Sequence, residues 1–442
     1  MRVAVIGQGY VGLTGAVALA RHGHRVVGVE QDGERLSRLR AGEPAVYEPG
    51  LAEHLASVLR TGRLDFVGCL EEATAADPVD AVLLSVGTPP APDGTANLSH
   101  VRQAVRQAAL LEGSPLVVLK STVPPGTSDA LLSEHPHLRE RYVYNPEFLN
   151  QGRALDDWQA PARTVVGTHA PAALARCREL YAWVSCPWVT TTPASAEMIK
   201  YASNAFLAAK ISFANEVAGL CADGDLDIDD VILGVGLDPR IGPALLTPGT
   251  GFGDSCLPKD TVALAHWARE RNIDTPLLDA TIETNVRRPG LLVRTLLESA
   301  GGRLNGLHVA VLGLRYEPWS DDLRAAPSRA VIPLLHEHDA VVRVWDPAMT
   351  AEDLRRAAPR AVAHPSLASA VSGAHAVLVL TAWPELTGAD WEELVPRMAE
   401  PRIVLDAKNC LPAPVLHRTP ALYRSVGNRR PSRQDPAPEP AA

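Results

Sequence analysis

The chain has 442 residues, enough for two or three domains. Hydrophobic residues make up 46% and charged residues 21%, which is typical of a soluble globular protein and excludes a disordered or fibrous one. The formal net charge of −9 disfavours a general electrostatic affinity for nucleic acid or for an anionic membrane.

The first third of the chain alternates short apolar runs with alanine-rich helical stretches, and we expect buried strands at residues 2–6, 25–29, 81–86 and 116–119. One long helix is expected at 194–222, where the sequence contains no glycine or proline until Gly219. A second alternation follows, with strands expected at residues 308–312, 341–345, 376–380 and 402–405. Such alternation is typical of parallel sheets that are covered by helices on both faces.

The predicted fold class is therefore α/β, with two Rossmann-like, doubly wound domains joined by a long central helix and a helical middle domain. We expect an N-terminal dinucleotide-binding domain at 1–193, a central helical domain at 194–300 and a C-terminal domain at 301–427. The remaining residues, 428–442, are rich in Pro, Arg and Ala and are expected to form a disordered tail.

The six cysteines form neither a CxxC pair nor a cluster with metal-ligand spacing, so no metal site is expected. A chain of this size with so few cysteines is no disulfide scaffold, and a reducing cytoplasm fits it best. The N-terminus lacks an apolar run of signal-peptide length, and no stretch approaches 18 uninterrupted apolar residues, so no membrane span is expected.

Arginine outnumbers lysine by 37 to 5. The few lysines, at positions 120, 200, 210, 259 and 408, are either placed by chance or occupy sites where arginine cannot serve. Only the ammonium group is compact and able to give up its proton at accessible cost.

A glycine-rich loop, Gly7-Gln8-Gly9-Tyr10-Val11-Gly12, lies between the first predicted strand and a helix. Its glycines allow a tight turn and the close approach of a pyrophosphate to a helix N-terminus. Glu30 ends the second predicted strand about 20 residues later, where a carboxylate binds a ribose 2′-hydroxyl and repels a 2′-phosphate. The pattern favours NAD over NADP, whereas a glycine-rich turn with a capping acid is the simpler alternative.

On the long helix, Glu197, Lys200 and Asn204 share one face, so an ammonium and an amide can be presented to one oxyanion. An ordinary solvated polar face is the alternative. Further on, a loop with three glycines, at 249, 251 and 253, contains Cys256 just before a predicted helix, with Lys259 and Asp260 nearby. A helix N-terminus and a nearby lysine lower a thiol pKa, which favours a nucleophile over a structural cysteine.

Together these motifs resemble the nucleotide-sugar 6-dehydrogenases, the family of UDP-glucose and GDP-mannose dehydrogenases. The resemblance covers roughly residues 1–411 and rests on the segments 7–12, 47–51, 86–89, 120–126, 145–149, 200–204, 240–242, 249–260 and 321–324.

The resemblance implies a four-electron oxidation of a sugar CH2OH group to a carboxylate, with two NAD as oxidants. A Cys256 thiolate would add to the intermediate aldehyde, and loss of a second hydride would give a thioester that water hydrolyses. By resemblance, Lys200 and Asn204 stabilise oxyanions, Thr122 and Asp260 handle water and protons, and Glu147 is the general acid/base. A glutamate acting as a base there needs a raised pKa, which partial burial would provide.

The resemblance also assigns binding residues. The positions implied for NAD are Gly7, Gly9, Tyr10, Val11, Gly12, Glu30, Arg35, Thr88, Thr122, Gln151 and Arg324. The positions implied for the nucleotide sugar are Glu147, Phe148, Leu149, Gln151, Lys200, Asn204, Arg240, Phe252, Gly253, Tyr316, Glu317 and Lys408. Arg240 matches an arginine that reaches a neighbouring subunit's site, so a homodimer built around the long helix is expected.

Several positions depart from the family pattern. Tyr316-Glu317 replaces Phe-Lys, Asp254 replaces a glycine, Gln151 replaces a glutamate, and Lys408 stands where arginine is usual. UDP-glucose is the expected substrate, with dTDP-glucose and GDP-mannose as alternatives. A two-electron hydroxy-acid dehydrogenase and a non-catalytic homologue that binds NAD and a sugar nucleotide remain as further alternatives.

Overall fold

A computed structural model describes residues 1–75, 77–253, 256–318, 323 and 326–428. The chain forms two compact units. Unit 1 contains residues 1–204 and 262–274, and unit 2 contains residues 205–261 together with the chain from 275 onward. The predicted division into three domains stays a prediction, and the predicted tail after Asn428 lies outside the described residues.

Unit 1 is built on one sheet with the strand order β3-β2-β1-β4-β5-β6-β7-β8, in which only the β6–β7 pairing is antiparallel. Its strands are β1 (Arg2–Ile6), β2 (Arg25–Val29), β3 (Leu64–Val67), β4 (Ala81–Leu84), β5 (Leu116–Leu119), β6 (Tyr142–Tyr144), β7 (Thr164–Gly167) and β8 (Trp188–Thr191). Its helical segments are α1 (Tyr10–Arg21), α2 (Gly33–Arg40), α3 (Leu51–Arg60), α4 (Leu70–Thr74), α5 (Ser99–Ala109), α6 (Thr127–Glu134), η1 (Pro136–Arg141), α7 (Ala154–Gln159) and α8 (Pro171–Leu180).

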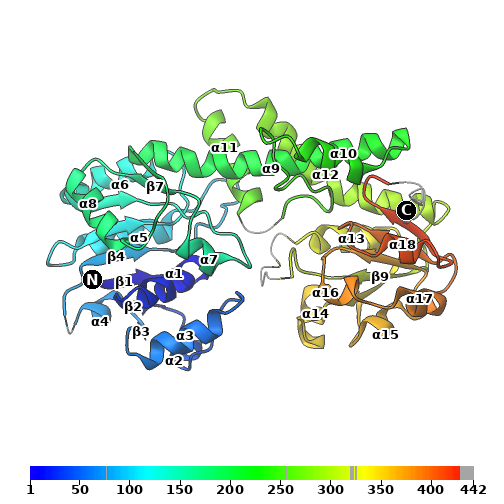
Figure 1. Cartoon of the computed structure of the whole chain (residues 1–442), viewed down its shortest axis with the longest axis horizontal. Coiled ribbons are helices and arrows are strands. Elements are labelled where there is room, and N and C mark those ends of the chain that lie inside the picture. Colours follow the sequence, from blue (N-terminus) through cyan, green and yellow to red (C-terminus); the bar gives the residue numbers. More distant parts are fainter. Residues whose placement is uncertain (76, 254–255, 319–322, 324–325, 429–442) are drawn as a thin grey trace, which may run out of the picture. The chain divides into compact units, whose positions relative to one another are not determined.

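The central strand β1 shows why helices must cover both faces of this sheet. Val3 and Val5 pack into one hydrophobic cluster with α1, α3 and α8, whereas Ala4 and Ile6 pack into a second cluster with α4, α5 and α6. Because successive side chains of a strand point to opposite faces, these two clusters are the two sides of one doubly wound sheet. Figure 1 shows its elements in blue to green.

Unit 2 contains a second, all-parallel sheet with the order β11-β10-β9-β12-β13-β14. Its strands are β9 (His308–Leu312), β10 (Val341–Trp345), β11 (Val362–Ala363), β12 (Ala376–Val379), β13 (Ile403–Asp406) and β14 (Leu422–Ser425). The helical segments after β9 are α13 (Ser328–Glu337), α14 (Ala351–Ala357), α15 (Leu367–Val371), α16 (Pro384–Thr387), α17 (Trp391–Leu394), η2 (Val395–Arg397) and α18 (Ala413–Leu416). Alternate residues of β9 again enter two clusters, so this sheet is also doubly wound.

The middle of the chain is helical. Its elements are α9 (Pro193–Gly224), α10 (Ile228–Gly236), α11 (Leu257–Arg269) and α12 (Pro276–Ser299). Figure 1 shows α9 as one long unbroken helix, as the sequence predicts. By length and composition α9 could also cross a membrane, but 44% of its apolar window is buried and the core helix of a soluble protein passes the same test.

These observations confirm the predicted fold class. The predicted strands recur with small corrections: β4 ends at Leu84, β12 ends at Val379, and β13 spans Ile403–Asp406. In unit 1 the parallel strands β1, β2, β4, β5 and β6 all end at the same edge of the sheet. That carboxyl edge is where doubly wound sheets bind ligands.

Candidate active site

The glycine loop after β1 has the shape that a dinucleotide pyrophosphate requires. Gly7 has a positive φ of 86°, and a Cβ there would lie 2.8 Å from the carbonyl oxygen of Ser85. At Gly12 a Cβ would collide with the carbonyl of Gly7, whereas the space beside Gly9 is open. Gly9 is also the N-cap of α1 and supplies no side-chain cap, so the first amides of α1 are left for a phosphate. These residues fit NAD.

Glu30 follows β2 at the same edge of the sheet and is almost fully buried. One of its oxygens accepts from the amide of Asp32 at 3.0 Å, and the other lies 3.4 Å from Nη1 of Arg35. This arrangement fixes a carboxylate where an adenine ribose would lie. Further along the same edge, the hydroxyl of Thr88 donates to the carbonyl of Thr122 at 3.0 Å, which joins the loops after β4 and β5.

Glu48, in the 47–51 motif, holds the turn that contains Gln151. Its carboxylate accepts from the amides of Gly152 at 2.9 Å and Ala154 at 2.8 Å, and from the hydroxyl of Tyr10. The side chain is buried. One carboxylate therefore joins the glycine loop to the predicted Gln151 turn, a role that the sequence pattern did not reveal.

Glu147, which follows β6, forms an ion pair with Lys200 of α9. The distance from Oε1 to Nζ is 3.0 Å, and the two side chains are only 10% and 5% exposed. Burial acts to raise the pKa of Glu147, but the ammonium of Lys200, the amide of Leu149 and the more distant Lys120 outweigh it, so that the pKa is lowered. The sequence-based expectation of a raised pKa is therefore wrong for this structure. Glu147 is ionised, and its ion pair with Lys200 makes it a weaker proton acceptor than a glutamate with a raised pKa.

Phe148 lies beside this pair. The Nζ of Lys200 lies 5.2 Å from the centre of its ring, and the guanidinium of Arg163 lies 3.8 Å from it. The next amide, that of Leu149, donates to Oε2 of Glu147 at 2.8 Å. The predicted residues Glu147, Phe148, Leu149 and Lys200 are thus brought together within unit 1. Asn204, one turn beyond Lys200, is buried on the same helix.

The buried Lys120 holds the start of the turn that contains Glu147. Lys120 donates to the side-chain oxygen of Asn145 at 2.9 Å and to its carbonyl at 3.2 Å. Its ammonium also lies 4.8 Å from the ring centre of Trp158. Burial lowers the pKa of Lys120 to about 8. The sequence marked this lysine by its rarity and by its place in the 120–126 segment, without a role, and its bonds to Asn145 hold the residues leading to Glu147.

In unit 2, Cys256 directly precedes α11, as predicted. Its carbonyl accepts from the amide of Asp260 at 3.0 Å, and the residue is partly exposed. Asp260 is buried and forms an ion pair with Lys259. The cysteine therefore lies at a helix N-terminus, where partial positive charge favours a thiolate.

The loop before Cys256 is held by side chains of α9 and α12. Asn215 accepts from the amide of Gly249 at 2.9 Å, and Arg288 donates to the carbonyl of Gly249 at 2.6 Å. Asn285 makes two bonds of 2.8 Å with the backbone of Phe252. The sequence analysis missed the roles of Asn285 and Arg288, although their i, i+3 spacing on one helix face is visible in the sequence. The backbone of Gly249 and Phe252 is thereby fixed, Gly253 follows directly, and Asp254 lies outside the described residues.

At the carboxyl edge of the second sheet, Lys408 follows β13, and Tyr316 and Glu317 follow β9. The Nζ of Lys408 lies 2.8 Å from Oε1 of Glu317 and 5.3 Å from the centre of the Tyr316 ring. The two departures from the family pattern are therefore partners of each other. Arg324, predicted to bind NAD, lies outside the described residues.

Arg240 lies on an exposed turn between α10 and the 247–253 loop. Its side chain is 88% exposed and is bonded to Asp238, and the ammonium of Lys210 donates to the carbonyls of Ile241 and Gly242. The turn therefore holds the guanidinium outward from unit 2.

Comparison with known proteins identifies a family with an NAD-binding domain, which agrees with the glycine loop and Glu30 described above. The UDP-glucose/GDP-mannose dehydrogenase family matches in three parts: its NAD-binding domain at residues 1–185, its central domain at 194–287 and its UDP-binding domain at 310–413.

Among individual relatives, the UDP-glucose 6-dehydrogenase of Pseudomonas aeruginosa is 39% identical, over 97% of this chain and 98% of that protein. The enzyme of that name from Rhizobium meliloti is 38% identical, over 97% and 99%. The solved structure of a UDP-glucose dehydrogenase from Pyrobaculum islandicum has a TM-score of 0.87 at 38% identity, over 97% of this chain and 98% of that one. The chain therefore belongs to the UDP-glucose/GDP-mannose dehydrogenase family, and it carries the NAD-binding, central and UDP-binding domains of that family in order.

Proposed function

We propose that the protein oxidises the C6 hydroxymethyl group of UDP-glucose to a carboxylate, consuming two NAD and one water and forming UDP-glucuronate. The observation that carries this proposal is the position of Cys256, a partly exposed cysteine directly before the N-terminus of α11, after a loop held by Asn285 and Arg288. A four-electron oxidation needs such a nucleophile, whereas a two-electron dehydrogenase does not. Its relatives named UDP-glucose 6-dehydrogenase support the choice of substrate.

NAD, when bound, accepts the hydride in each of the two oxidation steps. In the first step the C6 hydroxyl loses its proton and C6 loses a hydride, which leaves an aldehyde. The Lys200 ammonium, with Asn204 one turn further, stabilises the alkoxide that forms on the way. Ionised Glu147, held 3.0 Å from Lys200, supplies the acceptor into which the proton passes.

In the second step the Cys256 thiolate adds to the aldehyde carbon, and the new C–S bond places an oxyanion on C6. Loss of hydride to the second NAD gives a thioester. Water then attacks the thioester, Glu147 takes its proton, the C–S bond breaks, and the thiolate leaves. Asp260 and Thr122 are proposed to handle the water and its protons during these steps.

The nucleotide is proposed to bind unit 2. The loop through Phe252 and Gly253 and the residues Tyr316, Glu317 and Lys408 lie at or near the carboxyl edge of its sheet, where ligands of doubly wound folds bind. NAD is proposed to bind unit 1 through the glycine loop, Glu30, Arg35, Thr88, Thr122 and Gln151; Arg324, which the resemblance also implies for NAD, lies outside the described residues.

A panel of nucleotide sugars tests the substrate. We expect NADH to form fastest with UDP-glucose, with kcat/KM at least about tenfold above the values for dTDP-glucose and GDP-mannose, since discrimination by base contacts is worth about this much. A higher kcat/KM for either of those sugars would make it the substrate. Formation of NADH from none of them would favour the non-catalytic homologue, against which the presence of Glu147, Lys200, Asn204, Cys256 and Asp260 already argues.

The nucleophile is tested by Cys256→Ser. The alkoxide of serine is far harder to form than a thiolate, so we expect acid formation to fall by at least about 10³-fold. Cys69→Ser, which changes a partly exposed cysteine of unit 1, is the matched control and should retain full activity. Unchanged turnover of Cys256→Ser would refute the thioester route.

We further propose that the protein is a homodimer built around α9. Phe206, Phe213 and Leu220 recur every seven residues along this helix and are 67%, 52% and 71% exposed, which is a stripe that a second copy would cover. Arg240, held outward on its turn, would reach the partner's site. Light scattering should give twice the chain mass, and Phe213→Asp should give monomers with low activity. A monomeric wild type would refute this proposal.

The proposed compartment is the cytoplasm. The sequence has only six cysteines in 442 residues, which fits a reducing environment, and the oxidant NAD is a cytoplasmic cofactor. Activity found in the soluble cytoplasmic fraction of cells that express the chain would agree with this assignment, and activity confined to a secreted or membrane fraction would contradict it.

A further inference from the structure

Glu197 is a fully buried carboxylate that the proposed chemistry does not use. It lies on α9 one turn before Lys200, and its side chain points away from solvent toward α6. It accepts from the amide of Gly126 at 2.6 Å, from the amide of Ser128 at 2.7 Å and from the hydroxyl of Ser128 at 2.6 Å. Within the described residues it has no lysine or arginine as an ion-pair partner.

These contacts make Glu197 the N-terminal cap of a helix to which it does not belong. Gly126 is the N-cap of α6 and has a φ of 95°, and it offers no side chain to the free amides of the first turn. A carboxylate placed there satisfies two of those amides and interacts favourably with the helix dipole. The start of α6 and the start of α9 are thereby tied by charge-assisted bonds across 71 residues of sequence.

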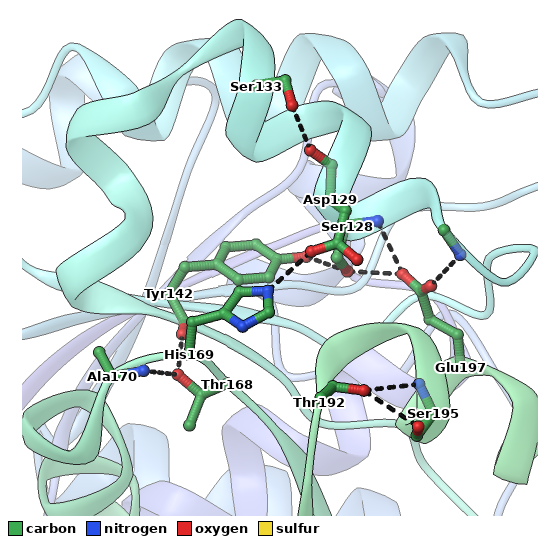
Figure 2. Close-up of polar contacts among 11 residues, drawn as sticks. Ser128, Asp129, Ser133, Tyr142, Thr168, His169, Ala170, Thr192, Ser195 and Glu197 are labelled. Atoms are coloured by element: carbon green, nitrogen blue, oxygen red, sulfur yellow. Dashed lines mark hydrogen bonds and ion pairs between the residues drawn. The ribbon is translucent and has the colours of Figure 1, made fainter.

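The cap also reaches strand β6. The Ser128 hydroxyl donates to Glu197, so its 2.7 Å bond to the Tyr142 hydroxyl must be donated by Tyr142. Burial raises the pKa of Tyr142, which keeps this phenol protonated and able to donate. Figure 2 shows the chain of bonds from Tyr142 through Ser128 to Glu197. Because β6 leads into the Glu147 turn, the network contacts three elements that lead to proposed catalytic groups.

We propose that Glu197 is a positioning residue whose carboxylate sets the Thr122 loop and the Glu147 turn in register with Lys200. The loop of residues 120–126 is held at Thr122 by the hydroxyl of Thr88 and at Gly126 by Glu197, so removal of one contact frees one end. This inference rests on the proposed function, because Thr122, Glu147 and Lys200 are the groups that it aligns.

Burying the Glu197 carboxylate costs folding free energy. A residue kept at such a cost is better explained by a positioning role than by packing alone. Burial raises the pKa of Glu197 to about 7, the bonds from Ser128 and Gly126 act against this shift, and nearby Asp129 adds to it. Because its pKa in the folded protein exceeds the ordinary value, the contribution of Glu197 to stability is most favourable below pH 4.5 and is lost as pH rises through about 7. The other titratable groups near this site are Tyr142, Tyr144, and His169 paired with Asp129.

The test is Glu197→Gln, which keeps the shape but removes the charge and turns an NH2 group toward the amides of α6. We expect kcat per mole of bound NAD to fall by about 10- to 100-fold, as misplacement by about 1 Å does, with KM for NAD within about threefold of wild type. Asp129→Asn is the matched control, since this carboxylate lies in the same turn of α6, contacts His169 and should leave kcat within about twofold.

Ser128→Ala removes one of the three bonds to Glu197 and should lower kcat less than Glu197→Gln does. The double variant should have nearly the same kcat as Glu197→Gln alone, because both changes act through one network. Hydrogen exchange gives a readout that needs no substrate: amides of residues 126–131 should exchange faster in Glu197→Gln and not in Asp129→Asn. Unchanged exchange, or a kcat within twofold of wild type, would overturn the proposal. Failure of the wild type to oxidise any nucleotide sugar would instead overturn the proposed function, and the exchange experiment would still test the cap.

Discussion

Two glutamate–lysine pairs lie beside the carboxyl edges of the two sheets, and their surroundings differ. Lys200 and Glu147 in unit 1 are 3.0 Å apart and almost fully buried, whereas Lys408 and Glu317 in unit 2 are 2.8 Å apart with Glu317 37% exposed. Similar distances do not mean similar energies, because water screens the more exposed pair, whereas each buried charge is costly without its partner. This difference in burial fits the proposal that the first pair takes part in the chemistry and that the second adjusts binding.

The largest expected effect comes from removing the buried ammonium. Lys200→Met should lower kcat by about 100-fold or more, since it deletes the donor to the developing oxyanion. Lys408→Met is the matched change in the exposed pair, and we expect it to alter KM for UDP-glucose with kcat within about threefold. Steady-state kinetics on both variants checks this contrast. A similar loss of kcat in both would contradict the distinction between the two pairs.

A second, smaller difference should appear in stability at acid pH. Lys200 and backbone donors lower the pKa of Glu147 despite its burial, so this carboxylate contributes stability above its ordinary pKa of 4.5 and loses that contribution as pH falls through the lowered value. Urea unfolding of wild type and Glu147→Gln should therefore differ most above pH 5 and converge toward pH 3. Glu317→Gln should run nearly parallel to wild type, within about 1 kcal/mol. If the free energies of unfolding of wild type and Glu147→Gln moved further apart as pH falls, the predicted pH dependence would be wrong.

The smallest effect is expected from Glu317→Gln. This change frees the Lys408 ammonium for an anionic diphosphate, so KM for UDP-glucose should fall by up to about threefold, and less at high salt. Glu352→Gln, in the exposed pair with Arg356, is the control and should leave KM unchanged. A rise in KM on Glu317→Gln would show that the glutamate itself contacts the substrate.

The sequence predicted the centre of each sheet well and the periphery poorly. β1, β5 and β9 are recognisable because both faces are buried, which leaves nearly continuous apolar runs. β8 (Trp188–Thr191) is mostly exposed and the short β6 leads directly into a loop, so neither gives such a run. The antiparallel pairing of β6 with β7 depends on tertiary packing that local periodicity does not report.

At the site, residue types were predictable but their partners were not. The rarity of lysine pointed to five positions, and all five ammonium groups donate to oxygens of named residues: Asn145, Glu147, Ile241 with Gly242, Asp260 and Glu317. Glu197 was placed on the same helix face as Lys200, but its partners Gly126 and Ser128 lie about 70 residues away, where helical spacing carries no information. The lowered pKa of Glu147 was missed for the same reason, because it depends on a lysine from another element.

The central claim is that Cys256 carries the sugar through a second oxidation. The most direct test is the amount of NADH formed per UDP-glucose consumed, measured at completion together with the acid product. The account predicts two NADH and one UDP-glucuronate for each UDP-glucose. A ratio of one, with the aldehyde as product, would contradict it.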